Sequence, residues 1–211
     1  MRVLARMACK LEITQIEQLI ASSQILIKSN LSEKRYIHSM NVAEVCAELS
    51  RHMKLDTVTS RKIYLGGILH DVAKENHKDS LRQMVARSAD VLGIIPAPSE
   101  VDEPKLWHAI AGAVYAKETL GIHDAELLHA IRFHTVSRGD MSIVEKIVNI
   151  ADWISVDRDF TGVEKLRELA FTDLDLSIYH AVKISIAKTM KKNGRIPIFT
   201  LSAYNYYCRV G

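Results

Sequence analysis

Six side chains in this sequence carry nitrogen or oxygen donors of the kind that bind metal ions. They are His38, His70, Asp71, His108, His134 and Asp152. Each lies within, or at the end of, a segment whose apolar residues recur at helical spacing. Four imidazoles and two carboxylates without a thiolate favour a divalent ion such as iron, manganese, cobalt or zinc, whereas calcium prefers more oxygen ligands. The set predicts a metal centre built from helices.

The strongest local signal is the adjacent pair His70 and Asp71, which ends the apolar run IYLGGILHD. Burying an imidazole and a carboxylate at the end of a core helix is costly unless they meet a partner. A salt bridge or a metal ion would supply that partner, and the dipeptide alone does not decide between them. The four further donors favour the metal.

Six protein ligands exceed what one catalytic zinc accepts, because such a site keeps an open position. They suit two metals if a carboxylate bridges them, and we expect Asp71 to be the bridge. Two divalent ions and two carboxylates, with neutral imidazoles, leave a charge of about +2 that attracts phosphate. Two ions roughly 3.5–4 Å apart also activate a shared water, so the predicted reaction is hydrolysis of a phosphate compound.

The order of His38, His70-Asp71 and Asp152 resembles the metal-binding pattern of the HD superfamily of phosphohydrolases. Five segments resemble more closely its YqeK-like group, the symmetrical bis(5'-nucleosyl)-tetraphosphatases, which hydrolyse diadenosine tetraphosphate (Ap4A). These segments, spread over about residues 33–175, are HSMNVAEVCAEL, YLGGILHDVAKE, WHAIAGAVYAKETLGI, AIRFHTVSRGDMS and KIVNIADWISVDRDFTGVEKLR.

The resemblance implies cleavage of Ap4A to two ADP by a water activated at two divalent metal ions. Iron is the expected metal, with manganese, cobalt or zinc as alternatives. The resemblance also implies how the ligands divide. One metal would take His38, His70, Asp71 and Asp152, and the other would take His108 and His134 with Asp71 as the bridge.

Three residues are predicted to act on the substrate, and two of them, together with Asp71, form the predicted catalytic set. Lys74 lies three residues after Asp71, on the same side if the helix continues, where it would reach a phosphate or pair with Asp71. Thr135 and Arg158 match positions where the family contacts phosphate, and arginine suits bidentate phosphate recognition. Lys74 and Arg158 are therefore predicted to be both catalytic and substrate-binding, and Thr135 to be substrate-binding.

The chain departs from the family pattern at two places. The family usually has Thr-Gly after the His-Thr of the His134 segment, where this chain has Val136-Ser137-Arg138-Gly139, and it usually has Glu-Pro near Ser155-Val156. We expect these residues to flank the substrate pocket and to affect nucleotide preference more than hydrolysis.

Helical periodicity predicts an all-α fold, and the family resemblance implies that it is a single HD-domain helical bundle over residues 1–211. Its core is expected at about 32–175, with an N-terminal helix and a C-terminal helical extension, because 211 residues suit one domain. The expected helices cover 13–29, 32–53, 57–73, 78–91, 105–120, 124–133, 141–156, 163–170 and 174–192, with a short one from about Thr200. Three prolines place the long loop between Val91 and Lys105. The segment 77–104 is interpreted either as a lid or as a plain connector.

Net charge, apolar stretches and cysteine spacing limit the classes of partner and the cell compartment that the sequence predicts. The net charge is +3 with basic residues spread along the chain, which hints at an anionic small molecule and argues against nucleic acid. The N-terminus lacks a long apolar region and no stretch suits a membrane span, so no membrane partner is expected. Cys9, Cys46 and Cys208 form no pairing motif, which favours the reducing cytoplasm. The expected partner is a dinucleoside polyphosphate, and a homodimer is compatible with the sequence.

Several alternatives remain at this level. Another HD hydrolase, such as a 5'-nucleotidase or a (p)ppGpp hydrolase, would need four ligands and one metal, and a nucleotide sensor would keep the pocket without turnover. Trp153 is interpreted as a core residue in preference to a nucleobase-stacking one. The remaining histidines are expected at the surface or at helix ends; they are His52, His77, His123, His129 and His180.

Overall fold

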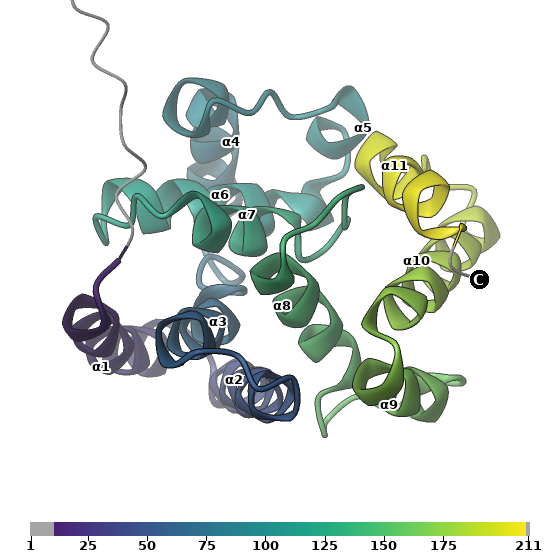
Figure 1. The fold of residues 1–211 in the computed structure, drawn as a ribbon. Coiled ribbons are helices and arrows are strands. Elements are labelled where there is room, and N and C mark those ends of the chain that lie inside the picture. The colour runs from purple at the N-terminus through teal and green to yellow at the C-terminus, as the bar shows by residue number, and fades with distance from the viewer. Residues whose placement is uncertain (1–10, 210–211) are drawn as a thin grey trace, which may run out of the picture.

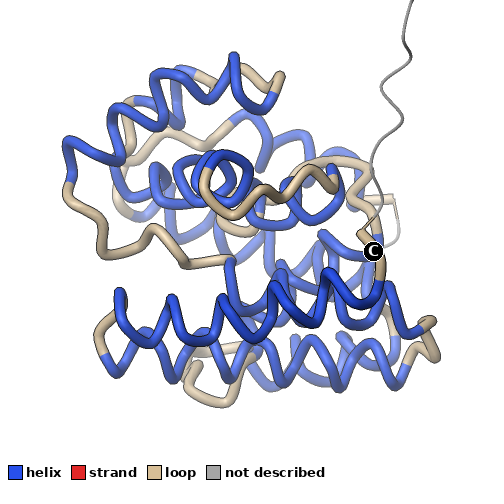
Figure 2. Tube along the Cα trace, turned by 90° about the vertical axis from the view of Figure 1, so that its left-hand side faces the viewer, coloured by secondary structure: helices blue, strands red, loops and turns tan. Residues whose placement is uncertain are grey.

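The structure is a computed structural model that describes residues 11–209, so Cys9 lies outside the described residues. Within this range the chain forms helices joined by turns, without a β-strand (Figure 2). The α-helices are α1 (Ile13–Asn30), α2 (Glu33–His52), α3 (Thr57–Leu69), α4 (Lys78–Leu92), α5 (Pro98–Val101), α6 (Trp107–Glu118), α7 (Ala125–Phe133), α8 (Ile143–Ile154), α9 (Val163–Thr172), α10 (Leu174–Lys191) and α11 (Ile198–Tyr207). The predicted all-α class is confirmed.

Helix α3 packs against α1, α2 and α8 (Figure 1), and its residues 62–69 are all buried. Two adjacent glycines make this position possible. A Cβ atom at Gly67 would lie 2.7 Å from the Cα of Ala43 on α2, and one at Gly66 would lie 2.8 Å from Val148 on α8. Because neither glycine has a side chain, both neighbours approach α3 closely, and the end of α3 is delivered into the middle of the bundle.

Two apolar clusters hold the helices around this axis. One joins α2 and α8 to α9, α10 and α11, which lie together on one side of α8 in Figure 1, and it includes the fully buried Ile150 and Ile178. The other joins α1, α3, α6 and α7 and includes Ile16 and Leu65, which are also fully buried. No helix among the described residues combines the length and apolar character that crossing a membrane requires.

The end of α3 differs from the prediction. The helix expected over 57–73 ends at Leu69, and the chain then makes a tighter turn in which Val72 N–H donates to Leu69 C=O and Lys74 N–H donates to Asp71 C=O. These bonds span three residues instead of the four of an α-helix. His70 and Asp71 therefore stand on a turn, and the reach of Lys74 follows from that turn and not from a continued helix.

The predicted loop between Val91 and Lys105 contains short helical structure, which the sequence analysis did not include. Helix α5 begins at Pro98, and a 3₁₀ turn covers Pro104–Leu106. Proline suits the first turn of a helix, since its missing N–H would be unpaired there anyway. Glu100 is fully buried and receives both terminal nitrogens of Arg132 at 2.8 Å. This ion pair fastens the segment to α7, as expected for a connector.

Candidate metal centre

The four predicted imidazoles form a row inside the bundle. Ring centroids are 5.3 Å apart for His38 and His70, 5.0 Å for His70 and His134, and 5.2 Å for His134 and His108. All four residues are buried. His38 stands in the second turn of α2 and His108 in the first turn of α6, while His70 and His134 directly follow α3 and α7. Four helices thus supply one continuous set of ring nitrogens.

The two carboxylates lie against different parts of this row. Asp152, in the last turn of α8, places Oδ1 3.0 Å from His38 Nε2 and 3.9 Å from His70 Nε2. The nitrogens and the carboxylate oxygen of these three residues lie within 4.8 Å of one another. The group is compact enough to surround a single ion.

Asp71 lies at the other end of the row. Its Oδ1 atom is 3.2 Å from His108 Nε2 and 3.5 Å from His134 Nε2. A second compact group, within 4.8 Å, consists of His70, Asp71 and His134. The residue common to both groups is His70, whereas the sequence analysis expected Asp71 to be shared. The structure thus brings all six predicted donors into one cluster, and their role as ligands stays a prediction.

The outer ring nitrogens show how the imidazoles are oriented. His70 Nδ1 lies 2.7 Å from Gly67 C=O, and His134 Nδ1 lies 2.8 Å from Ile131 C=O. A carbonyl oxygen only accepts, so each Nδ1 carries the proton, and each Nε2 presents a lone pair to the cluster. Metal-binding histidines usually have this arrangement, with the outer nitrogen held by an oxygen.

Buried polar atoms that lack hydrogen-bond partners indicate whether a metal ion suits the cluster. Among the described residues, His70 Nε2 is buried and has no hydrogen-bond partner, while Asp71 Oδ1 is buried with ion-pair contacts of 3.2–3.5 Å to His108, His134 and Lys74. Buried polar atoms in folded proteins are nearly always paired, so the unpaired acceptor on His70 suits a cation. The nitrogen and oxygen donors suit a divalent transition metal. The residues present therefore fit such an ion.

The protonation states agree with this interpretation. Burial lowers the pKa of His70 to about 4, and burial also lowers the pKa of His108. Burial alone would raise the pKa of Asp71, but the neighbouring His70, His108 and His134 outweigh it and hold that pKa well below its ordinary value. Neutral imidazoles and an ionised carboxylate are the forms that bind metals.

Asp157 is a residue that the sequence analysis missed. Its Oδ2 atom lies 2.7 Å from His38 Nδ1, and its Oδ1 accepts a hydrogen bond from Asn41 Nδ2 at 3.3 Å. The carboxylate thus supports the outer face of His38 as the backbone carbonyls support His70 and His134. The available signal was its position five residues after Asp152, across the end of α8.

The predicted substrate residues surround the cluster in different ways. Lys74 Nζ lies 2.9 Å from His108 Nε2 and 3.5 Å from Asp71 Oδ1, so it pairs with Asp71, which was one of its two predicted roles. Arg158 Nε donates to Asp152 C=O at 2.7 Å, and Nη2 of Arg158 contacts the Asp152 carboxylate. Thr135 carries a buried hydroxyl without a partner among the described residues. Arg35, a cation that was not predicted, reaches Asp71 at 3.4 Å.

A cavity of about 240 Å³ adjoins the cluster. It is lined by His134, Thr135, Asp152, Trp153, Arg158, Phe160 and Lys188. We call it the site cavity. Two of the six donor residues and two of the predicted substrate residues, Thr135 and Arg158, therefore share one space. Trp153 is half-buried and packs against the core while also lining this cavity.

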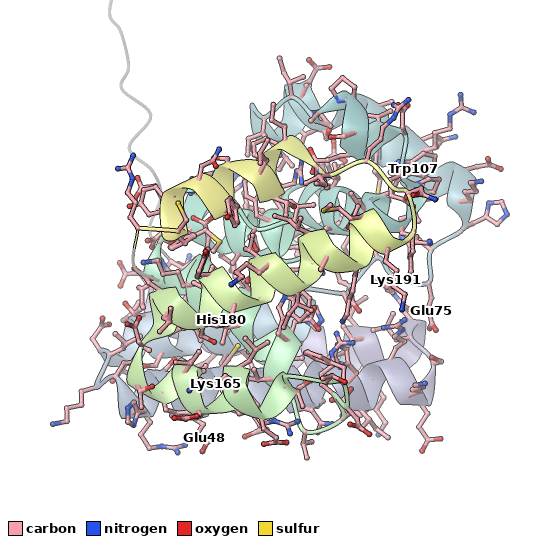
Figure 3. The ribbon with its side chains drawn as sticks, turned by 90° about the vertical axis from the view of Figure 1, so that its right-hand side faces the viewer. Glu48, Glu75, Trp107, Lys165, His180 and Lys191 are labelled. Carbon is pink, nitrogen blue, oxygen red and sulfur yellow. The ribbon has the colours of Figure 1, made fainter. Side chains whose placement is uncertain are left out.

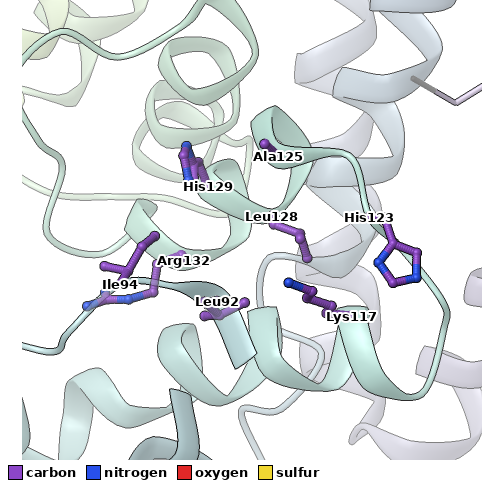
Figure 4. Close-up of a pocket in the computed structure, with 8 residues that line it drawn as sticks. All are labelled: Leu92, Ile94, Lys117, His123, Ala125, Leu128, His129 and Arg132. Carbon is purple, nitrogen blue, oxygen red and sulfur yellow. The ribbon is translucent and has the colours of Figure 1, made fainter. Parts of the chain in front are cut away.

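Another cavity lies apart from the cluster. Figure 4 shows it between the end of α4, α6 and α7, with a volume of about 100 Å³. His123 and His129 line it, and none of the six donors does. Both histidines were predicted to stand outside the metal centre, and their positions agree with that prediction.

The residues that depart from the family pattern do not line the site cavity. Ser137 adopts a left-handed backbone with φ of 56°, which explains why the family usually has glycine there. Its hydroxyl accepts from Asn149, and Arg138 pairs with Glu145. Val156 is 77% exposed and lies in a different surface pocket. Their chain neighbours Thr135, Trp153 and Arg158 do line the site cavity, so the expectation that these residues flank the substrate pocket stays a prediction.

Comparison with known proteins agrees with the fold and the cluster. Residues 35–157 match the HD domain family. The chain is 36% identical over 180 residues to a protein of Bacillus subtilis, covering 85% of this chain and 92% of the relative. It is 39% identical, with the same coverage, to a protein of Halalkalibacterium halodurans. Both relatives are named symmetrical bis(5'-nucleosyl)-tetraphosphatase.

A solved structure is similar as well. A protein of Clostridium acetobutylicum, described as an HD superfamily hydrolase involved in NAD metabolism, has a TM-score of 0.81 and 31% identity, covering 91% of this chain and 98% of that one. The chain belongs to the HD-domain family. The resemblance seen in the sequence is thereby confirmed, while the extension of one domain over all of residues 1–211 stays a prediction.

Proposed function

We propose that this chain is a metal-dependent phosphohydrolase that cleaves Ap4A symmetrically to two ADP. The observation that carries the proposal is the row of four imidazoles with a carboxylate against each part, beside a cavity that contains Arg158. Relatives that match over most of their length and are named symmetrical bis(5'-nucleosyl)-tetraphosphatase support the same activity. A single-metal nucleotidase would not need His108 and His134 in the row.

The metal proposal concerns two divalent ions, held by the six clustered residues. Iron is the proposed metal, with manganese, cobalt or zinc as alternatives, because the donors are nitrogen and oxygen and include no sulfur. When bound, such ions lower the pKa of a water molecule towards neutrality and withdraw charge from a phosphate oxygen. The protein's own contribution is the arrangement of the donors and the cations around them.

The cations around the cluster account for substrate binding. Arg158 uses Nε and Nη2 on Asp152, and the remaining guanidinium donors are available for a phosphate oxygen. Lys74 pairs with Asp71 and His108, and we propose that rotation of its side chain would bring its ammonium group to a substrate phosphate. Thr135 offers a free hydroxyl in the same cavity. These three groups would stabilise the charge on the departing ADP.

The test is product analysis with the iron- or manganese-loaded protein. Ap4A, a deoxynucleoside monophosphate and ppGpp are supplied separately, and the products are separated by ion-exchange chromatography. The proposal expects two ADP per Ap4A as the fastest reaction. Release of AMP with ATP, or faster release of phosphate from the monophosphate, would contradict it. Binding of Ap4A without any product would favour the nucleotide sensor.

The two-metal assignment has its own test. His108→Ala should lose one of two bound metals and reduce hydrolysis, because His108 stands at one end of the row and touches only part of the cluster. Metal content is measured by elemental analysis, and circular dichroism checks that the helices persist. The matched control is His77→Ala, an exposed histidine that should keep both metals. Retention of both metals in His108→Ala would contradict the assignment.

A further inference from the structure

The site cavity contains a group of side chains that the proposed function has not used. Trp153, Phe160 and Lys188 line the same space as His134 and Asp152 of the cluster. Phe160 and Lys188 lie beyond the part of the chain that matches the HD domain, which ends at residue 157. Figure 3 shows α10, which carries Lys188, lying across this side of the molecule between the labelled His180 and Lys191.

The rings of Trp153 and Phe160 both face the ammonium group of Lys188. Their centroids are 5.6 Å apart at 75°, and Lys188 Nζ lies 4.3 Å from the Phe160 centroid and 5.1 Å from the Trp153 centroid. The ammonium group therefore lies over two rings that line the site cavity, where a cation is attracted by the ring faces. Flat π-systems such as nucleobases stack on open aromatic faces without strict sequence preference.

The charges near Lys188 favour an anion. Burial lowers the pKa of Lys188, and the charges of Arg158 and Lys192 lower it further. The charged side chains that line the cavity are the cations Arg158 and Lys188 and the carboxylate of Asp152, which Arg158 contacts, so Lys188 is left to balance a phosphate. The space therefore combines an aromatic surface with an anion-binding one, next to the metal cluster.

We propose that Trp153, Phe160 and Lys188 form the subsite for one nucleoside diphosphate half of the substrate, with the base stacked on the rings and Lys188 bound to the phosphates. The inference rests on the proposed function and names where it selects a nucleotide. A base entering the ring faces displaces the ammonium, which then meets the incoming phosphates. The volume of about 240 Å³ is just below the roughly 300–1,000 Å³ of common ligand pockets, so it suits half of a dinucleotide and not the whole.

The experiment compares two probes that differ by the nucleoside. ADP and inorganic pyrophosphate are titrated by calorimetry into the metal-loaded full chain, into Phe160→Leu and into Lys188→Met. Phe160→Leu should weaken ADP binding by about tenfold and leave pyrophosphate within about twofold, because only ADP carries a base. Lys188→Met should weaken both probes by about tenfold, because both carry a diphosphate.

The chain offers matched controls. Phe171 is a half-buried phenylalanine in a different pocket, and Lys183 is a lysine of α10 whose ammonium lies 5.0 Å from the Tyr179 ring. Phe171→Leu and Lys183→Met should leave the affinity for both probes unchanged. In the unmodified protein, ADP should quench tryptophan emission more than pyrophosphate does, and this measurement requires no substitution.

Three results would overturn the subsite. They are an unchanged ADP affinity in Phe160→Leu, an equal loss of ADP and pyrophosphate binding in that variant, and equal quenching by the two probes. A failure of the proposed function looks different. If Ap4A is not cleaved to ADP while ADP binding still depends on Phe160, the hydrolase proposal is wrong and the nucleoside diphosphate subsite stands.

Discussion

Two buried polar clusters in this molecule differ in how their atoms are matched. Arg132 and Glu100 are 1% and 0% exposed, and their charges cancel through two parallel hydrogen bonds of 2.8 Å. In the cluster of six predicted metal donors, ring nitrogens face one another, and the cations Lys74, Arg35 and Arg158 contact His108 and the two carboxylates. His108 Nε2 lies 3.3 Å from His134 Nε2, and His70 Nε2 has no hydrogen-bond partner among the described residues. The first cluster is neutral, and its atom without a partner among the described residues, Arg132 Nε, is a donor that a cation would not satisfy. The second cluster leaves an acceptor, His70 Nε2, unpaired.

The difference separates a structural ion pair from a binding site. Donors matched to acceptors satisfy a buried group within the protein, whereas converging lone pairs require a cation from outside. Burial and charge alone would rank the two clusters alike. The direction of the lone pairs distinguishes them, and the following predictions test that distinction.

The largest expected effect is on stability and comes from breaking the Arg132–Glu100 ion pair. Glu100→Gln should lower the free energy of unfolding by about 3–5 kcal/mol, because it leaves the Arg132 charge buried and uncompensated. Metal content and turnover of the folded protein should not change. Urea unfolding measures the loss, and Glu118→Gln is the control. That change breaks an exposed pair with Arg87, each side chain about 40% exposed, which should cost less than about 1 kcal/mol. Loss of metal in Glu100→Gln would show that the two clusters are not independent.

A smaller effect concerns pH in protein stripped of metal by a chelator. His70 has a folded pKa of about 4 against an ordinary value of 6.5, so between these values the unfolded chain binds the proton and the folded chain does not. The stability that neutral His70 contributes is therefore present above pH 6.5 and is lost as the pH falls towards 4. The gap between the two pKa values corresponds to roughly 3 kcal/mol.

The measurement compares wild type with His70→Gln by urea unfolding at pH 6.5 and pH 4. Subtracting the variant removes the opposite contribution of His38. Burial lowers the pKa of His38, but Asp152 raises it above the ordinary value, so its stabilisation is present at low pH and lost as the pH rises. An equal difference between the two proteins at both pH values would show that His70 is not held neutral by burial.

The smallest expected effect is on metal affinity and concerns Asp157, which contacts the outer nitrogen of His38. Asp157→Asn should weaken metal binding by about 10–100-fold, because Asp157 orients His38 from the side opposite the cluster. Competition with a chelator of known affinity measures it. Asp159→Asn, an exposed aspartate two residues further on, should bind metal like the wild type. If Asp157→Asn bound metal equally well, His38 would be positioned by packing alone.

Much of the fold was predictable because helices leave a local signature. Apolar spacing gave α8 and α10 to within about two residues of their ends, since that spacing depends on near neighbours in the sequence. The six donors were predictable as a set because His70 and Asp71 end an apolar run and the family resemblance supplied the rest.

Other features depend on contacts that no local pattern encodes. Asp157 lies against His38, which is 119 residues earlier in the chain, and Lys188 on α10 lies over Phe160 in the loop before α9. The turn after Leu69 was also missed, because IYLGGILHD reads as an uninterrupted helix until the surrounding helices are in place. Trp153 was interpreted as a core residue, and it both packs on the core and lines the site cavity.

Gly67 makes the positions of His38 and His70 depend on how closely α2 and α3 pack. Its C=O holds the Nδ1 proton of His70, while its missing side chain lets α2, and with it His38, lie against α3. One atom added here would meet the backbone of Ala43, which has no flexible end to give way. The distance between the imidazoles of His38 and His70 thus depends on the van der Waals contact between Gly67 and Ala43, one helical turn before His70. Gly67 therefore constrains the spacing of two predicted metal ligands without being one of them.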